Sequence, residues 1–397
     1  MKDRDVSPIA PDHRSGRRWP RLLPSLLSSL DSPGDAVGFV GPNWYASIMG
    51  TGIIANAAAT LPLIRAELHP FALGVWILDT ALLLLLSLAV AAHWLRHPHV
   101  ARSHMSDPSM AQFYGAPPMA MMTIGGGALL VGKSLIGLRA AVDLDWVLWT
   151  LGTAGGLFTA VSIPYLLFTQ HDVRPDAAFG GWLMPVVPPM VSAANGALLI
   201  PHLASIPARA TLLYGCYAMF GLSLIAALII ITLIWSRLAH YGSSGTARVP
   251  TLWIVLGPLG QSVTAATSLG LQAHLAVHAQ LASAMSTMAV LFGVPVFGFI
   301  VLWSALATAL TIRTIRRGLP FALTWWSFTF PVGTCVTGIT GLALRTGLPA
   351  FRWTAVIAYG FLLAAWLTVA VRTALGSLSG RLLLAPDSSG PVVASKN

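Results

Sequence analysis

The residues best suited to chemistry are hydroxyl side chains spaced along the apolar segment 324–341. Five residues follow one another at steps of three and four and so share one helical face: Ser327, Phe330, Thr334, Thr337 and Gly341. A helix that keeps hydroxyls on one stripe inside a membrane faces something other than lipid. Phe330 is the bulky member of the stripe, and Pro331 directly follows it. The pattern predicts a pore-lining helix, bent at Pro331 and closed by the Phe330 ring.

Hydroxyl and amide side chains recur in other apolar segments of the chain. These further candidates for a polar path are Asn43, Ser47, Thr51, Thr123, Ser192, Asn195, Gln261, Thr264 and Ser268. Such dipoles can replace part of the water that an anion loses inside a membrane. Hydroxyls in membrane helices also often bond their own i−4 carbonyl or join two helices. We expect the set to line an anion path, and the role of each single residue stays open.

Charged side chains within apolar segments are few. Asp79 is the one acid placed within an apolar core, where a lone carboxylate is costly unless it is protonated, paired or close to water. Two roles are open for it: a proton carrier that couples anion movement to a gradient, or a neutral acid at a helix contact. Lys133, Arg139 and Arg345 stand near segment ends and are candidates for attracting anions, an effect that salt would weaken.

The sequence predicts no metal site, cofactor or enzymatic activity. His274 and His278 lie one helical turn apart, but no third ligand or acidic neighbour stands near them in the sequence. Cys216 and Cys335 fall inside apolar segments and offer neither a disulfide framework nor a metal spacing. The glycines at 125–127 lie in the middle of an apolar segment and lack the context of a phosphate-binding loop.

The composition is that of a membrane protein. Hydrophobic residues make up 55% of the 397 residues and charged residues only 9%, with a mean hydropathy of +0.74. A soluble protein of this length is about one quarter charged. The net charge of +10 could indicate nucleic-acid binding, but the basic residues are scattered among short loops. Their collection in cytoplasmic loops of a membrane protein explains the charge better, so no nucleic-acid partner is predicted.

Ten segments are long enough to cross a bilayer, so we predict an all-α integral membrane protein. They cover residues 40–61, 70–94, 114–137, 146–169, 178–200, 209–236, 249–274, 283–312, 321–344 and 351–375. With the N-terminus inside, most of the 23 Lys and Arg residues fall on the cytoplasmic side, which favours cytoplasmic termini.

The predicted transmembrane domain, residues 39–375, lies between two cytoplasmic tails. In the N-terminal tail, residues 1–38, the leucines of 22–30 share one face behind several arginines, which is typical of a helix on the membrane surface. A cleaved or twin-arginine signal is the alternative. The C-terminal tail, residues 376–397, is predicted to be disordered.

The odd-numbered segments differ from the even-numbered ones in kind. Each odd-numbered segment contains proline and collects polar side chains. Bends are expected at Pro118, Pro188, Pro258 and Pro331. Bent backbone with freed carbonyls is tolerated in a membrane where it is buried in protein or lines a wet cavity. We therefore predict five helical hairpins, with bent polar helices around a central pore and straighter leucine-rich helices outside.

Two motifs resemble those of the tellurite-resistance/dicarboxylate transporter family. The first is Pro42–Tyr45 followed by Met49–Ile53, and the second is Trp325–Pro331. This family includes fungal malate permeases, fungal sulfite efflux pumps, bacterial tellurite-resistance channels and plant slow anion channels. The resemblance extends over nearly all of residues 40–375.

The resemblance implies ten helices as five hairpins around a central pore, usually in a homotrimer with one pore per subunit. It also implies that Phe330 gates the pore, whereas a core phenylalanine beside a proline bend is the alternative. The expected function is transport of a small anion across the cell membrane, with a C4-dicarboxylate such as malate first and sulfite second. A passive, gated inorganic-anion channel is a further possibility, and the driving force stays open.

Overall fold

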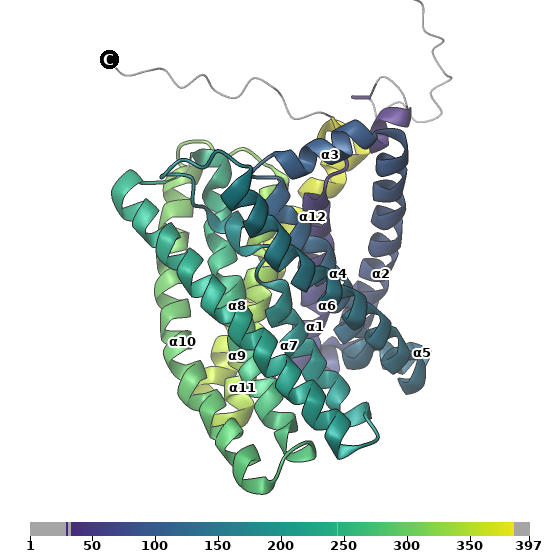
Figure 1. Ribbon diagram of the computed structural model, residues 1–397, viewed down its shortest axis with the longest axis vertical. Helices are drawn as coiled ribbons and strands as arrows, with labels where there is room; N and C mark the ends of the chain where they lie inside the picture. Colours follow the sequence, from purple (N-terminus) through teal and green to yellow (C-terminus); the bar gives the residue numbers. More distant parts are fainter. Residues whose placement is uncertain (1–28, 31–32, 244, 385–397) are drawn as a thin grey trace, which may run out of the picture.

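Two kinds of helix alternate along the chain. The computed structural model describes residues 29–30, 33–243 and 245–384, and every regular element in this part of the chain is a helix (Figure 1). Five long helices, called the outer helices here, hold between 30 and 37 residues each. They are α2 (Arg65–Arg96), α6 (Leu138–Thr169), α8 (Ile206–Tyr241), α10 (Ala279–Ile315) and α12 (Pro349–Leu378).

Five shorter helices, called the inner helices here, hold between 12 and 17 residues each. They are α1 (Tyr45–Thr60), α4 (Ala116–Gly127), α7 (Pro188–Leu199), α9 (Leu256–Gln272) and α11 (Phe330–Thr346). The most apolar windows of the α4, α9 and α11 spans are 67 to 83% buried, against 22 to 33% for the outer helices. The inner helices therefore face protein, and the outer helices face the surroundings.

A 3₁₀ segment lies ahead of each inner helix. These segments are η2 (Pro42–Trp44), η3 (Ala111–Gly115), η5 (Gly180–Leu183), η7 (Thr246–Val255) and η9 (Leu323–Phe328). The sequence predicted bends within continuous helices, whereas the structure places Pro118, Pro188, Pro258 and Pro331 in the first turns of α-helices. A proline is favourable there because its missing amide would have no intrahelical partner. The inner segments thus change from 3₁₀ segments to α-helices at or shortly before these prolines.

The inner helices contact one another in a closed circuit. In that circuit α1 contacts α4, α4 contacts α7, α7 contacts α9, α9 contacts α11, and α11 contacts α1. Each inner helix also packs against the outer helix that follows it in the chain. Figure 1 shows α10 and α2 at opposite edges of the bundle, with α1, α9 and α11 between them.

Eight helical spans in the described residues are long and apolar enough to cross a membrane. The all-α membrane architecture predicted from the sequence is therefore confirmed. The segments that contain α1 and α7 are not among the eight, and these two α-helices have 16 and 12 residues. At 1.5 Å per residue neither α-helix alone covers a hydrocarbon core of about 30 Å.

The two ends of the chain are only partly described. Residues 22–28 of the predicted surface helix, and residues 385–397 of the C-terminal tail, lie outside the described residues. The first residues of the predicted C-terminal tail are helical, because α12 continues to Leu378 and η10 (Arg381–Leu383) follows it. Leu382 folds back against Gly376, so this part of the chain packs onto α12.

Glycine allows the closest approach between two inner helices, α9 and α11. A Cβ atom added at Gly260 of α9 would overlap the backbone nitrogen of Cys335 in α11. On the facing helix, a Cβ added at Gly338 would lie 2.8 Å from the carbonyl oxygen of Gly260. Small residues let membrane helices approach this closely, and the gain is van der Waals contact and hydrogen bonding between backbones.

Substitution Gly260→Ala tests this contact. The added methyl group meets fixed backbone atoms, so we expect the free energy of unfolding to fall by about 1–3 kcal/mol. Gly257→Ala is the matched control on the same helix, since its Cβ would have 3.9 Å to the nearest atoms of Pro331. Thermal unfolding of purified protein in detergent measures both. Equal unfolding temperatures for the two variants would contradict the close contact.

Candidate functional site

Phe330 is the first residue of α11 and directly follows the break after η9. Its side chain is only 3% exposed, so the ring does not face lipid. Three residues later, Gly333 packs against Ile53 of α1. Phe330 therefore lies in the part of the inner circuit where α11 runs beside α1.

The hydroxyls that follow Phe330 on the stripe bond within α11 and to α9. Thr334 Oγ1 donates to the carbonyl oxygen of Pro331 at 2.7 Å and lies 3.2 Å from the carbonyl oxygen of Gly257. Thr337 Oγ1 and Thr264 Oγ1 are hydrogen-bonded to each other at 2.8 Å. The predicted path residues of α9 and α11 are thus brought together, and their hydroxyls also join the two helices.

A partly accessible polar face remains on these otherwise buried helices. Thr264 and Ser268 of α9, Thr337 of α11 and Asn195 of α7 are half-buried. Gln261 lies one turn before Thr264, is 4% exposed and makes no side-chain hydrogen bond within the described residues. This polar face, contributed by α9 and α11, is the best candidate for the wall of a path. Asn195 also donates from Nδ2 to the carbonyl oxygen of Met122 in α4, at 2.6 Å.

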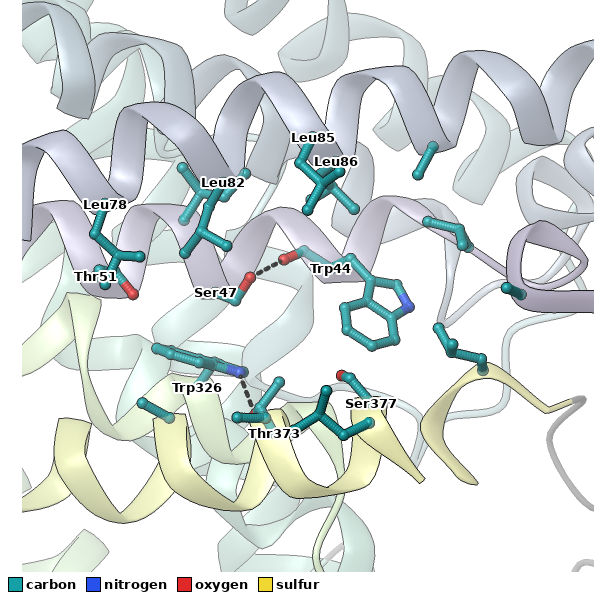
Figure 2. A pocket seen from close by; sticks show the side chains of 18 of the residues that line it. Trp44, Ser47, Thr51, Leu78, Leu82, Leu85, Leu86, Trp326, Thr373 and Ser377 are labelled. Carbon is teal, nitrogen blue, oxygen red and sulfur yellow. Dashed lines mark hydrogen bonds between the residues drawn. The ribbon is translucent and has the colours of Figure 1, made fainter. Parts of the chain in front are cut away.

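Ser47 and Thr51 of α1 line a different space. They border an apolar groove of about 510 Å³ between α2 and α12, which no residue of α9 lines (Figure 2). Ser47 Oγ donates to the carbonyl oxygen of Trp44 at 2.7 Å, and Thr51 Oγ1 accepts from Trp366 Nε1 at 3.1 Å. Helical spacing placed both residues on a polar stripe, and the groove shows what that stripe faces.

Other predicted path residues lie in protein contacts. Thr123 Oγ1 donates to the carbonyl oxygen of Met119 at 2.7 Å, and Ser192 Oγ to that of Pro188 at 3.2 Å. Both are the i−4 bonds that the sequence left open as an alternative. Ser327 is buried within η9, and Asn43 is half-buried in η2 at the start of the first inner segment.

Helix α4 is fixed by side chains from three neighbouring helices. Three consecutive carbonyl groups accept them: Met122 from Asn195 Nδ2 (2.6 Å), Thr123 from Asn56 Nδ2 (2.9 Å) and Ile124 from Trp76 Nε1 (3.1 Å). The three glycines of 125–127 follow, and then a π-helical turn, η4 (Ala128–Gly132). Such turns inside helices frequently mark functional sites. Asn56 and Trp76 were not among the predicted residues.

Two buried carboxyl groups flank this part of α4. Asp79 of α2 packs against Gly52 of α1, where an added Cβ would overlap its carboxyl group and contact Thr123 of α4. Asp145 of α6 occupies the corresponding place against Gly125 of α4. Both side chains are 0% exposed, and none of their oxygens has a hydrogen-bond partner among the described residues.

Asp145 corrects the expectation that Asp79 is the only acid within the apolar core. The predicted fourth segment began at residue 146, whereas α6 begins at Leu138 and buries Asp145. One signal in the sequence could have found it. Asp145 shares a helical face with Ala141, Gly152 and Gly156, and all of these are buried.

The candidate basic residues differ in burial. Lys133 and Arg139 are exposed, while Arg345, in the last turn of α11, is half-buried. Partial burial of His202 and, second, the positive charge of Lys133 lower the pKa of the His202 imidazole. No group of three or more His, Cys, Asp or Glu side chains in the described residues could hold a metal ion.

Comparison with known proteins finds a matching family model and related transporters. A family model described as voltage-dependent anion channel matches residues 40–374. An uncharacterised transporter of Methanocaldococcus jannaschii is 25% identical over 312 residues, which cover 78% of this chain and 86% of the relative. A sulfite efflux pump of Trichophyton rubrum is 27% identical over 324 residues, 80% of this chain and 85% of the pump. Another, from Arthroderma otae, is 28% identical over 316 residues, 77% and 82% of the two chains.

The burial of Asp145 can be tested with a cation at the same position. Substitution Asp145→Arg places a charge in a site without partners, so we expect a loss of about 3 kcal/mol in the free energy of unfolding. Asp143→Arg, at an exposed position of the same helix, is the control and should cost little. Thermal unfolding in detergent distinguishes them, and similar behaviour of both variants would show that Asp145 reaches water.

Proposed function

The chain belongs to the voltage-dependent anion channel family, a group of anion transporters and channels, and from this membership we propose that it carries sulfite across the membrane. The predicted membership of the tellurite-resistance/dicarboxylate transporter family is thereby confirmed. The relatives named as sulfite efflux pumps match over most of both chains, which favours sulfite over the malate that was expected first. Malate stays the second candidate substrate.

The proposed path runs inside the circuit of inner helices. In this proposal ten segments cross the membrane as five inner–outer hairpins, with both termini in the cytoplasm and the protein in the plasma membrane. Two observations support it: each inner helix packs on the outer helix that follows it, and 3₁₀ segments lengthen the short inner helices. The homotrimer implied by the family resemblance is part of the same proposal.

Dipoles along this path would replace part of the anion's water shell. Gln261, Thr264 and Ser268 of α9 and Thr337 of α11 supply amide and hydroxyl groups on a partly accessible face. None of the five inner helices contains Asp or Glu. A wall of neutral dipoles without carboxylates attracts an anion weakly enough for it to leave again. Family membership carries the proposed substrate, and this polar face carries the proposed path.

Phe330 would close the path. Its ring is buried at the start of α11, where an aromatic side chain in a narrow apolar constriction blocks an ion both by its volume and by excluding water. The alternative of a core phenylalanine beside Pro331 predicts no effect on permeation. Phe330 as a gate and Phe330 as a core residue differ in the anion permeation expected after the ring is removed.

Asp79 would couple anion movement to a proton gradient. Its carboxyl group packs against Gly52 of α1 close to the Thr123 side chain of α4, and it has no hydrogen-bond partner among the described residues. A proton gained or lost there would change the packing of three helices at once. The alternative is a neutral acid with a purely structural role, or a passive channel without coupling.

The substrate is tested by uptake into proteoliposomes. We expect the purified protein to move sulfite faster than malate, chloride or nitrate, when each is offered at the same concentration with and without a pH gradient. Liposomes without protein are the control for sulfur dioxide that crosses the lipid unaided. Protein-dependent uptake of malate without uptake of sulfite would reverse the order of the two candidates.

Substitution Phe330→Ala tests the gate. Removal of the ring opens the constriction, so we expect protein-dependent sulfite flux to rise by about tenfold, the change that a barrier lowered by about 1.4 kcal/mol produces. Phe158→Ala, on the lipid-facing side of α6, is the matched control because Phe158 is 67% exposed. An unchanged flux in a folded Phe330→Ala variant would favour the core reading.

Substitution Asp79→Asn tests the coupling. The amide keeps the size of the side chain but cannot exchange a proton, so uptake should persist while its stimulation by a pH gradient is lost. Asp145→Asn, the second buried carboxyl, shows whether the effect belongs to Asp79 alone, and exposed Asp143→Asn is the control. Intact pH-driven uptake in Asp79→Asn would end the coupling proposal.

A further inference from the structure

A polar cavity of about 590 Å³ lies at the end of the bundle where three inner segments begin. Its walls come from the last turns of α6 and α8 and from the stretches that lead into α4, α7 and α9. Three arginines line it: Arg174, Arg237 and Arg248. None of the residues of the polar face on α9 and α11 borders this cavity, so the two are separate. A cavity of this size has room for a small molecule.

Arg237, near the end of α8, is held firmly in the cavity wall. Its side chain is only 7% exposed. Nε donates to the carbonyl oxygen of Asp176 at 2.9 Å, and Nη1 donates to that of Gly242 at 2.7 Å. The third nitrogen, Nη2, has no hydrogen bond to any described residue. The two carbonyl dipoles orient the guanidinium group but do not cancel its charge, and buried charges in proteins are generally paired.

Arg248 of η7 is fixed beside the same cavity by two other contacts. Its Nη2 donates to Ser109 Oγ at 2.9 Å, and its guanidinium carbon lies 5.0 Å from the centre of the Phe179 ring. Ser109 and Phe179 also line the cavity. An arginine stacked on an aromatic ring presents its remaining donors in a defined plane. Arg248 is exposed, so a solute can reach those donors.

Three carboxylates also line the cavity, but none of them pairs with Arg237 or Arg248. Asp176 forms an ion pair with Arg174 at 3.1 Å, and this is the one ion pair within the described residues. Asp107 Oδ1 accepts from two backbone amides at 2.8 and 2.6 Å. Asp172 is exposed. The charges of two arginines in the cavity are therefore left without a counter-ion at ion-pair distance.

We propose that this cavity binds a phosphate group through Arg237 and Arg248. The two guanidinium groups come from different elements, and a tetrahedral oxyanion has enough oxygen atoms to accept from both. Trp182 and Tyr241 add aromatic surface for the rest of a phosphorylated molecule. A soluble phosphate compound and the headgroup of a phospholipid share this chemistry. The site goes beyond the proposed function and does not depend on which anion the protein carries.

Binding at this place has a structural consequence, because the segments around the cavity pack backbone against backbone. A Cβ atom added at Gly180 of η5 would overlap the carbonyl oxygen of Thr251 in η7. The bond from Arg248 to Ser109 joins η7 to the stretch ahead of α4. A phosphate group held by both arginines would add a link from these segments to α8, so binding should stabilise the folded protein.

The site is tested by stability as a function of phosphate concentration. For the purified protein in an uncharged detergent, sodium phosphate should raise the unfolding temperature above that in sodium gluconate of equal pH and ionic strength. Arg248→Gln should weaken the apparent dissociation constant for phosphate by about tenfold or more, because hydrogen bonds to a charged group are lost. Arg316→Gln is the matched control, since Arg316 is exposed at the end of α10 and does not line the cavity. Equal stabilisation of the wild type and Arg248→Gln by phosphate would overturn the proposal.

Two further variants sharpen this test. Arg237→Gln should lose the response to phosphate, and Arg248→Lys, which keeps the charge but not the planar fork, should fall between the wild type and Arg248→Gln. Arg237→Gln also loses hydrogen bonds to two carbonyl groups. If it does not fold, the exposed position of Arg248 carries the test alone. A folded Arg237→Gln variant with wild-type affinity for phosphate would contradict the site.

Nanodiscs distinguish the two sources of the phosphate group. If the ligand is soluble, sodium phosphate should stabilise the wild type in nanodiscs of phosphatidylcholine and in nanodiscs that contain phosphatidylglycerol. If a lipid headgroup enters the cavity, phosphatidylglycerol alone should stabilise the wild type more than Arg248→Gln and remove the response to sodium phosphate. Both results support the site, whereas no difference between the wild type and Arg248→Gln under any of these conditions would refute it.

Discussion

In a membrane, every backbone amide and carbonyl group must find its partner inside the protein. The inner helices leave many backbone groups at their ends, because each is short and most begin or end against a 3₁₀ segment or a loop. Side chains of neighbouring helices supply some of the partners. Trp76 of α2 donates to the carbonyl oxygen of Ile124 in α4, and Trp149 of α6 donates to that of Ser192 in α7. The outer helices thus shield the inner ones from lipid and also bond to their backbone.

The same demand explains why hydroxyls and amides gather on the inner helices. Thr334 donates to a carbonyl group of α9, Thr264 donates to one of α11, and Asn195 and Asn56 donate to those of α4. These side chains stabilise close helix packing and leave a polar face at its edge. A path built from such groups has no fixed charge along most of its length, which suits an anion that must enter and also leave.

Helix α4 is where structural and functional demands meet most closely. Three of its carbonyl groups accept hydrogen bonds from side chains of α1, α2 and α7. Three glycines and a π-helical turn follow these carbonyl groups along the chain. The carboxyl groups of Asp79 and Asp145 flank this region from two outer helices. Glycine gives both carboxyls their room, because any side chain at Gly52 or Gly125 would collide with them. A change in the packing of α4 would therefore alter its contacts with four helices, α1, α2, α6 and α7.

The sequence by itself determined the helical membrane architecture and the residues that share a face. Composition and segment length require membrane helices, and the motif around Phe330 indicates the family. Only the tertiary structure decided what each face meets. Ser47 and Thr51 border a lateral groove, Pro331 lies in the first turn of an α-helix, Asp145 is buried, and the buried Nη2 atom of Arg345 has no hydrogen-bond partner among the described residues. Periodicity along one helix fixes directions relative to its axis, whereas its neighbours are set by contacts between residues far apart in the chain.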